Sequence, residues 1–369
     1  MTTRYLGNMP IHFPNNQVLI TGASGWLGHG LLRVLTQGLP EVEALRTPPD
    51  VRIRALVEPT QDIRTLQAEY PQIEFIAGDL RRPDDCRRFC EGAAGATVLH
   101  LVGLIHPRRI RELYAINVEC TRNLHTAAIE AGIKRIVSMS SNSPAGCNPN
   151  REHRFTEQSP YNPYMHYGRA KMQMEQLIQS IHATGNIETV VIRATWFYGP
   201  FHPPRQSLFF RMVRDGQAPI IGSGENLRSM SCIYNVCHAL ILAATTDKAN
   251  GELYWIADER AYTMNEIVDT VERLLETEFG QTCRHKRLRL PNLACEVARF
   301  IDGCLQSVGL YHQKIHVLSE MNKHIACSIE KARQELGYHP AFGLEEGIRR
   351  SLQQMHDNGE FNDGAAHSQ

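Results

Sequence analysis

The sequence lacks the features that mark several classes of protein. Its 369 residues carry a formal net charge of zero, so nothing indicates nucleic acid or an anionic membrane as the main partner. Residues 1–16 contain no basic-then-apolar signal pattern, and the most apolar later run, Leu290–Leu310, is broken by Glu296, Arg299 and Asp302. We therefore expect neither a secretion signal nor a membrane span, and we expect a cytoplasmic protein.

Cysteine pairs with metal-ligand or redox spacing are also absent. None of the ten cysteines forms a Cys-x-x-Cys motif, and Cys86 and Cys90 have no histidine or cysteine pair nearby. We predict reduced thiols in the core and no metal site. The chain is long enough for one large or two unequal domains.

A glycine-rich turn follows the first apolar run, Gln17–Ile20. Gly22, Gly25 and Gly28 come next, and after them apolar residues recur at helical spacing. This order predicts strand, turn and helix. Glycines let the backbone approach a diphosphate closely, and the helix N-terminus supplies free amides and a partial positive charge. The alternative is a glycine turn that binds nothing.

Three more predicted strands end in residues that could contact a dinucleotide. Glu58 follows the strand 51–57, where an acid favours NAD by bonding the ribose hydroxyls and repelling a 2′-phosphate. Nearby arginines leave NADP open. Asp79 follows the strand 73–77 and either reaches the adenine or caps the next helix. The strand 96–103 contains His100, which we interpret as a core histidine.

The alternation of strands and helices predicts an α/β fold with a doubly wound parallel (Rossmann) sheet. A helical pattern over 111–132 leads into the strand Arg135–Ser141. Ligands of such sheets bind at the carboxyl ends of the strands. Ser141 lies at one such end, where its hydroxyl donates either to a substrate oxygen or to a local backbone group.

Tyr167 and Lys171 are spaced one helical turn apart, so their side chains can serve one site. A nearby ammonium group would lower the pKa of the phenol and make Tyr167 a usable proton donor or acceptor. The alternative is a surface helix in which a tyrosine packs against a lysine stem.

The domain organisation follows from where this alternation stops. We predict a dinucleotide-binding domain over 17–200, with 231–258 returning to it, and a smaller, mostly helical substrate domain formed by 201–230 and 259–355. Residues 1–16 and 356–369 are predicted flexible tails.

With Gly22/Gly25/Gly28, Asp79-Leu80, Ser140-Ser141, Tyr167/Lys171 and Tyr198-Gly199-Pro200 in this order, the chain resembles an extended short-chain dehydrogenase/reductase of the NAD-dependent epimerase/dehydratase type. The resemblance covers residues 17–352. It implies catalysis by Tyr167, Ser141 and Lys171, and a homodimer formed through the Tyr167 helix and its predecessor. It further implies NAD contacts from Gly22, Ser24, Gly25, Trp26, Leu27, Gly28, Glu58, Asp79, Leu80, Leu101, Val102, Gly103, Tyr167, Lys171, Ala194 and Thr195.

Three positions bear on the substrate, for which we expect a small molecule contacted by Asn142, Phe197 and Arg228. Asn142-Ser143 stand where 4,6-dehydratases of this family carry Asp-Glu, which disfavours dehydration. Arg228 matches an arginine that holds the diphosphate of a nucleotide sugar, although Asn235 replaces an acid that is usual nearby.

Three hypotheses for the function follow. The first is a nucleotide-sugar epimerase with a transient keto intermediate. The second is a dehydrogenase or reductase of the 3β-hydroxysteroid or dihydroflavonol type, acting on a more apolar substrate. Its pocket would be lined by Tyr161, Trp196, Phe197, Phe201, Phe209 and Phe210. The third is a catalytically silent NAD-binding protein.

Overall fold

A seven-stranded sheet forms the larger part of the protein, whose structure is a computed structural model that describes residues 11–361. The strand order is β10-β6-β5-β4-β1-β2-β3, and every neighbouring pair is parallel. The predicted α/β doubly wound sheet is thereby confirmed. The strands are β1 (Gln17–Thr21), β2 (Arg52–Val57), β3 (Glu74–Ala77), β4 (Thr97–His100), β5 (Arg135–Ser141), β6 (Glu188–Ala194) and β10 (Leu253–Ile256).

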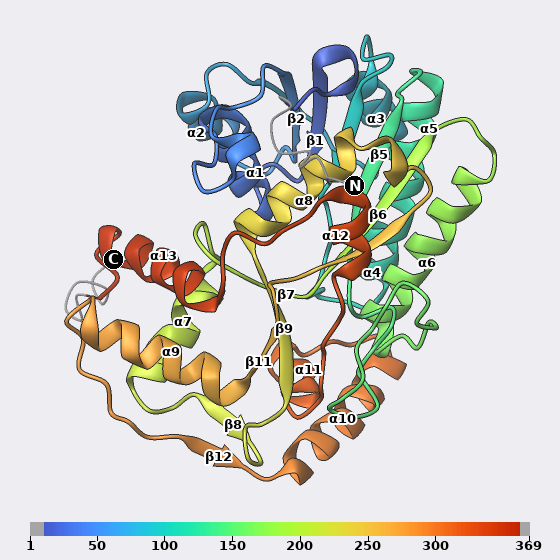
Figure 1. Ribbon diagram of the computed structural model, residues 1–369. Coiled ribbons are helices and arrows are strands. Elements are labelled where there is room, and N and C mark those ends of the chain that lie inside the picture. The colour runs from blue at the N-terminus through green and yellow to red at the C-terminus, as the bar shows by residue number, and fades with distance from the viewer. Residues whose placement is uncertain (1–10, 362–369) are drawn as a thin grey trace, which may run out of the picture.

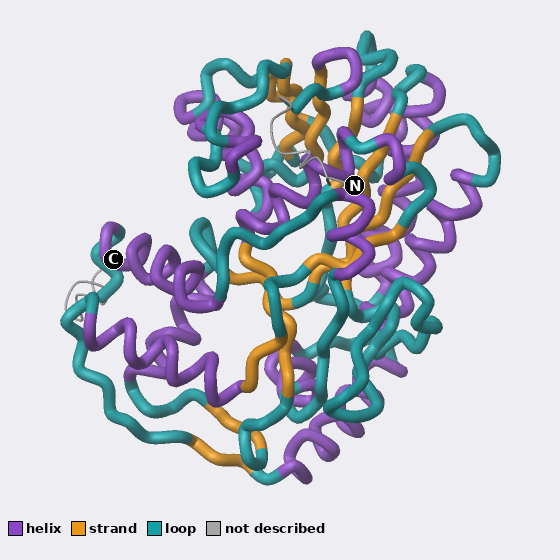
Figure 2. Tube along the Cα trace, viewed as in Figure 1, coloured by secondary structure: helices purple, strands orange, loops and turns teal. Residues whose placement is uncertain are grey.

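Helices cover both faces of this sheet, as Figures 1 and 2 show. Side chains alternate between the faces: Val18 and Ile20 of β1 pack in the cluster that contains α1 and α8, whereas Leu19 packs in the cluster of α3 and α5. We call the sheet and its helices the sheet lobe. Its helices are α1 (Trp26–Gln37), α2 (Ile63–Glu69), α3 (Pro83–Cys90), α4 (Arg111–Tyr114), α5 (Cys120–Glu130), α6 (Met165–His182), α8 (Ile233–Thr245) and α12 (Glu330–Leu336), with a π-helical turn at Ala115–Glu119 and 3-10 turns at Pro14–Asn16, Glu43–Leu45 and Asp247–Ala249.

The remaining elements form a second lobe below the carboxyl edge of the sheet in Figure 1. A three-stranded sheet, β11-β9-β7, joins the two lobes, and a parallel pair, β8 and β12, lies at the far end. The elements are β7 (Trp196–Tyr198), β8 (Pro219–Ile221), β9 (Leu227–Cys232), β11 (Ala261–Thr263), β12 (Leu288–Leu290), α7 (Pro204–Arg214), α9 (Met264–Thr277), α10 (Asn292–Ser307), α11 (Gln313–Glu320) and α13 (Leu344–Asp357).

The junction between the lobes is fixed by a buried carboxylate. Asp258 accepts hydrogen bonds from the Tyr198 hydroxyl at 2.5 Å, from the Cys232 amide at 3.1 Å and from the Asn235 side chain at 3.0 Å. Burial raises the pKa of Asp258 to about 7 despite these donors. Asn235, which replaces the expected acid, therefore has an acidic partner supplied by another part of the chain.

The ends of the chain are more ordered than predicted. Phe13 is buried in the main core and Phe361 packs against Phe279, so 13–16 and 356–361 are not free tails. Hydrophobic burial of these two aromatic rings outweighs the polar composition around them. Residues 1–10 and 362–369 of the predicted tails lie outside the described residues.

The structure can be compared with two predictions, that the cysteines are reduced thiols in the core and that no segment spans a membrane. Each of the ten cysteines, all within 11–361, is free, and Cys304 is an exception to the predicted core position because it is exposed. Among the described residues, no helix has the length and apolar character needed to cross a membrane.

Candidate functional site

The glycine turn after β1 leaves no room for side chains. Gly22 has a φ of 77°, and a Cβ on Gly28 would lie 2.2 Å from the Gly22 carbonyl oxygen. The Gly25 amide donates to the same carbonyl at 3.0 Å, and α1 begins at the next residue. No side chain caps this helix, so its first amides are available to an anion. The turn, with Ser24 and Leu27 in it, fits a dinucleotide diphosphate.

Trp26 links this turn to the second lobe. Its indole nitrogen donates to the Pro200 carbonyl at 2.7 Å, and its ring meets the Phe197 ring edge-on at 6.2 Å. A predicted cofactor residue and a predicted substrate residue are thus in contact. The Tyr198-Gly199-Pro200 break therefore positions the entrance to the cofactor site as well as ending β7.

The two acids predicted to meet the adenosine lie at the ends of β2 and β3 and share one arginine. The guanidinium of Arg81 is 2.7 Å from Asp79 and 3.2 Å from Glu58. Its hydrogen bonds with Asp79 hold the pKa of that carboxyl below its usual value. Leu80, between Asp79 and Arg81, is buried. No sequence pattern predicts a role for Arg81, because it does not lie at the end of a strand.

The segment after β4, Leu101–Gly103, borders the predicted catalytic lysine. A Cβ on Gly103 would lie 3.2 Å from Lys171 Nζ and 3.4 Å from Asn117 Oδ1. Asn117 lies in the π-helical turn and exchanges two hydrogen bonds with the backbone of Leu104, at 2.9 and 3.0 Å. Such π-turns often accompany functional sites. Asn117 was missed because the sequence pattern of 111–132 indicates only a helix.

Tyr167 and Ser141 are brought together by close packing of α6 on the loop after β5. A Cβ on Gly168 would lie 2.5 Å from the Ser143 carbonyl oxygen, so only glycine permits this approach. The Ser141 hydroxyl accepts from the Ser143 amide at 3.3 Å and lies close enough to Tyr167 to lower the pKa of its phenol. The side-chain oxygen of Asn142, a predicted substrate residue, lies 3.5 Å from the Ser141 hydroxyl oxygen.

The expected effect on the acidity of Tyr167 is wrong for this structure. The pKa of Tyr167 is raised to about 12, first by burial and also by the nearby charge of Glu320, against a lowering hydrogen bond from Ser141. The Lys171 ammonium instead donates to the Met139 carbonyl at 3.0 Å. Loss of hydration therefore outweighs any help from the lysine.

Lys171 is itself perturbed. Its side chain is 3% exposed, and burial lowers its pKa to about 8, while Glu175 acts in the opposite direction. Glu175, one turn further along α6, forms a buried pair with Arg193 of β6 at 2.6 Å and accepts from Ser140 of β5. This pair fixes α6 to the two strands whose ends lie at the site.

Arg228 of β9 supplies a buried positive charge on the substrate side. It is 7% exposed, one terminal nitrogen donates to the Glu320 carbonyl at 2.6 Å, and its Nε has no partner among the described residues. Burial lowers the pKa of Arg228. An arginine in this state is a ready partner for phosphate oxygens, which would supply the missing hydrogen bond and countercharge.

A buried charged cluster connects α10 and α11 above Tyr167. His316 is 2.7 Å from Asp302 and 3.1 Å from Glu320, and these carboxylates raise its pKa to about 9 although burial opposes the shift. Tyr311, between the two helices, packs in the same cluster as Tyr167 and bonds His106 at 2.6 Å. Composition indicated only amphipathic helix here, so these residues were missed.

The other predicted contacts are divided between the two lobes. Ala194 ends β6, and the Thr195 hydroxyl bonds Ser231 of β9 at 2.9 Å. The aromatic residues proposed for an apolar pocket do not form one group: Trp196 packs near Phe209, whereas Tyr161 lies 5.4 Å from the Arg193 guanidinium. No cluster of metal-ligating side chains occurs within 11–361.

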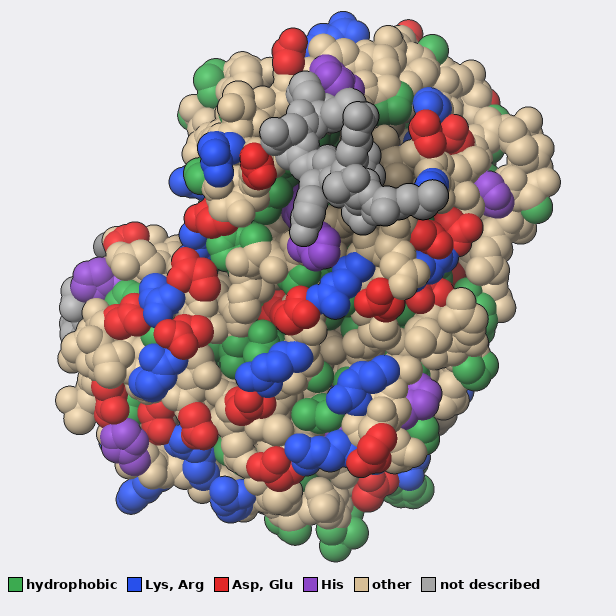
Figure 3. All heavy atoms as spheres, viewed as in Figure 1, with side chains coloured by type: hydrophobic (Ala, Val, Ile, Leu, Met, Phe, Trp, Pro, Cys, Tyr) green, Lys and Arg blue, Asp and Glu red, His purple; other side chains and the backbone are tan. Residues whose placement is uncertain are grey.

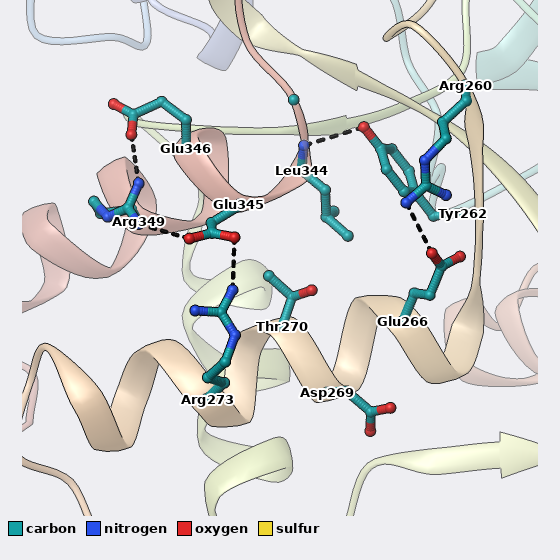
Figure 4. Close-up of a pocket in the computed structure, with 11 residues that line it drawn as sticks. Arg260, Tyr262, Glu266, Asp269, Thr270, Arg273, Leu344, Glu345, Glu346 and Arg349 are labelled. Atoms are coloured by element: carbon teal, nitrogen blue, oxygen red, sulfur yellow. Dashed lines mark hydrogen bonds and ion pairs between the residues drawn. The ribbon is translucent and has the colours of Figure 1, made fainter.

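The surface is also hollowed away from Tyr167, between α9 and α13, where a pocket of about 670 Å³ lies (Figure 4). Its charges are paired across it: Arg273 with Glu345 at 2.7 Å, and Arg349 with the same glutamate at 2.9 Å. The Tyr262 hydroxyl accepts from the Leu344 amide at 3.1 Å. These internal pairs offer no unsatisfied group to a ligand, so we do not consider this hollow the active site.

Comparison with known proteins agrees with this geometry. The model of the "NAD dependent epimerase/dehydratase family" matches residues 18–257. The chain belongs to this family. It is therefore an NAD-dependent enzyme of the extended short-chain dehydrogenase/reductase type, and its cofactor is NAD.

Among curated proteins, an uncharacterized protein of Sinorhizobium fredii is 48% identical over 352 residues, which are 95% of this chain and 98% of that one. The N-acetyl-alpha-D-glucosaminyl-diphospho-ditrans,octacis-undecaprenol 4-epimerase of Escherichia coli O157:H7 is 27% identical over 348 residues, 92% and 95% of the two chains. The 3beta-hydroxysteroid-dehydrogenase/decarboxylase isoform 1 of Arabidopsis thaliana is 26% identical over 293 residues, 76% and 66% of the two chains.

Proposed function

We propose that the protein is an epimerase of a diphosphate-linked sugar, which it oxidises at a secondary alcohol and reduces again through a transient keto intermediate. The observation that carries this proposal is Arg228, a buried guanidinium with an unpartnered Nε. A buried guanidinium nitrogen without a hydrogen-bond partner is costly, so the site is suited to a ligand that brings an anionic acceptor. The 4-epimerase of Escherichia coli O157:H7, named for a diphospho-linked sugar, supports the same substrate class.

The position of Arg228 relative to Tyr167 suits a substrate that reaches from a diphosphate to a sugar ring. Glu320 lies between them, because its backbone carbonyl accepts from Arg228 while its carboxylate raises the pKa of Tyr167. The diphosphate would bind Arg228 and the sugar hydroxyl would lie against Tyr167 and Ser141. The forked guanidinium of arginine binds phosphate oxygens in a fixed orientation. The diphosphate bound to Arg228 would therefore orient the sugar ring.

The glycine turn, Glu58 and Lys171 would hold NAD, and the nicotinamide would supply an acceptor, and later a donor, for the hydride. Tyr167 takes the proton of the reacting hydroxyl and later gives it back to the carbonyl oxygen, while Ser141 donates a hydrogen bond to that oxygen. With a pKa of about 8, Lys171 stays mostly protonated at neutral pH. Its charge is therefore available to favour the phenolate when substrate binding rearranges the site.

The test is binding of uridine diphosphate to the NAD-loaded protein, measured by calorimetry. We expect Arg228→Gln to weaken binding about 10-fold to 100-fold, since charged hydrogen bonds contribute about 1.5–3 kcal/mol. Arg228→Lys keeps the charge but loses the forked guanidinium, so its loss of affinity for uridine diphosphate should be smaller than that of Arg228→Gln. Unfolding curves of both variants control for stability. Incubation with a nucleotide sugar should interconvert two epimers without accumulation of NADH.

A dehydrogenase acting on an apolar alcohol is the second candidate. The Arabidopsis thaliana relative, named as a 3beta-hydroxysteroid dehydrogenase/decarboxylase, favours it, as do Trp196 and Phe209 beside the break after β7. This candidate predicts steady formation of NADH from a sterol alcohol. If that occurs while uridine diphosphate fails to bind at millimolar concentration, the epimerase proposal is wrong.

A further inference from the structure

Helix α10 has its apolar side facing solvent. Leu293, Val297, Phe300, Ile301 and Val308 share one side of the helix, and we call them the α10 apolar face. Leu293 is 70% exposed, Phe300 73% and Val308 70%. Figure 3 shows hydrophobic side chains projecting at the lower end of the molecule, where Figure 1 places the beginning of α10. Surface helices normally present the opposite arrangement to water.

The rotation of α10 about its axis is fixed from the buried side. Asp302 and Gln306 lie opposite the apolar face and are buried. Asp302 binds His316 at 2.7 Å, and Gln306 accepts from the His166 amide at 3.1 Å. Turning the apolar face inward would break both contacts and expose the cluster beside Tyr167. The exposure of the α10 apolar face therefore follows from contacts on the opposite side of the helix.

Arginines lie next to this face. The loop after β4 is bridged to the end of α10, because Arg109 pairs with Leu310 and the Ile110 amide donates to Gly309 at 3.1 Å. Arg108, Arg109 and Arg111 are exposed and none forms an ion pair among the described residues. The nearby carboxylate of Glu112 accepts from the backbone amide of Arg108 at 2.8 Å. An apolar stripe is thus flanked by uncompensated positive charge.

We propose that the α10 apolar face and the adjoining arginines dock the protein on an anionic lipid surface. A bilayer takes Leu, Phe and Val side chains into its acyl boundary while phosphate headgroups meet arginines, and this pairing needs no spanning helix. A second copy of this chain is a poorer occupant. A two-fold contact pairs the face with itself, and the acid on α10 nearest to it, Glu296, is already bound by Arg299 and Lys323.

The inference goes beyond the proposed function and does not depend on it. Docking would place α10 and α11, which cover Tyr167, against the membrane. A substrate carrying a lipid chain could then enter the site without crossing water. The association itself, however, requires neither substrate nor turnover.

The test is flotation of the full chain with vesicles of phosphatidylcholine, with and without one third phosphatidylglycerol. We expect flotation with the anionic vesicles and less with phosphatidylcholine alone. The double variant Leu293→Ser/Phe300→Ser should reduce the bound fraction about ten-fold, since each loses buried apolar area. Leu208→Ser is the matched control, because Leu208 is 51% exposed but lies on α7. Arg108→Gln/Arg109→Gln should weaken binding and its dependence on salt.

The outcomes separate this inference from the alternatives. Failure of the wild-type protein to float with anionic vesicles overturns it, and so does equal flotation of the Leu293→Ser/Phe300→Ser variant. Light scattering that shows a dimer lost in that variant, without vesicle binding, assigns the face to a second copy instead. Tyr167→Phe should float like the wild type, so lipid docking can fail or succeed independently of the epimerase proposal.

Discussion

The sheet lobe and the second lobe build their parts of the site by different means. The glycine turn after β1 works through backbone geometry, because Gly22 has a φ of 77° and a Cβ on Gly28 would lie 2.2 Å from the Gly22 carbonyl oxygen. The second lobe works through side chains that bind residues far apart in the sequence, such as Arg228 with the backbone carbonyl of Glu320, and Tyr311 with His106 of the sheet lobe.

This difference has a chemical reason. A dinucleotide presents a diphosphate, which backbone amides can bind without any charged side chain. A variable substrate must be distinguished by groups that reach into a pocket, and loops and helices outside the sheet can supply them without disturbing the strands. The sheet lobe should therefore tolerate few changes of shape, whereas the second lobe should respond to changes of charge.

The largest effect on cofactor binding should follow Gly28→Ala, which breaks the backbone geometry. The new Cβ would lie 2.2 Å from the Gly22 carbonyl. We expect about a 10-fold to 100-fold loss of NAD affinity by calorimetry, since overpacking typically costs about 1–3 kcal/mol. The matched control is Gly303→Ala on α10, where a Cβ would meet nothing within 4 Å. It should leave NAD affinity unchanged and stabilise the fold by about 0.5–1 kcal/mol. Unchanged NAD affinity in Gly28→Ala would refute the packing argument.

The largest effect on turnover should follow Tyr167→Phe, which removes a proton carrier at the contact between the lobes. We expect the turnover rate to fall about 10²-fold to 10⁴-fold with NAD affinity nearly unchanged. Tyr164→Phe is the matched control, because the Tyr164 hydroxyl binds Ser319 of α11, at 2.8 Å for the side-chain oxygen. Its effect should fall mainly on the Michaelis constant. A Tyr167→Phe variant with wild-type turnover would require another proton donor.

A smaller effect, dependent on pH, should follow His316→Gln in the second lobe. The pKa of His316 is raised to about 9 in the folded protein. The charged histidine therefore stabilises the fold fully below the unfolded pKa of about 6.5, and that stabilisation is lost as pH rises through 9. We expect the variant to be about 3 kcal/mol less stable near pH 6 by urea unfolding, with the deficit shrinking by pH 9.

The matched control for this pH dependence is His125→Gln in the sheet lobe. Burial lowers the pKa of His125 to about 4, so this histidine is neutral in the folded state at both ends of that range. Its deficit should stay constant above about pH 6.5. Equal pH slopes for the two variants would mean that the Asp302–His316–Glu320 cluster does not hold an extra proton.

The fold was largely predictable because the strands of a parallel sheet are buried on both faces. Continuous apolar runs and glycine turns marked each strand of the sheet, and β5 was predicted at Arg135–Ser141, where the structure has it. Of the site, motifs predict Ser141, Tyr167 and Lys171; in the structure Ser141 lies close enough to Tyr167 to lower the pKa of its phenol, and Lys171 lies beside Gly103.

What the sequence could not provide depends on contacts between distant residues. Asn117 is distinguished by a π-turn that a helical pattern does not reveal, and Glu320 acts through Arg228 and His316, which periodicity cannot connect. The raised pKa of Tyr167 reflects burial, which depends on the assembled site. The face of α10 is hidden in the sequence because Asp302, which looks like a break in an apolar run, is buried, whereas the apolar Leu293 and Phe300 are exposed.

The contact between Arg228 and Glu320 also has a consequence for synthesis. The two residues are 92 positions apart, and all seven strands of the main sheet precede residue 257. At about 5–20 residues per second, a ribosome takes roughly 5–20 s to make the stretch between them. A nascent chain thus completes its nucleotide-binding sheet well before it completes the cover of its substrate site. We expect NAD to be the ligand that can first assist folding.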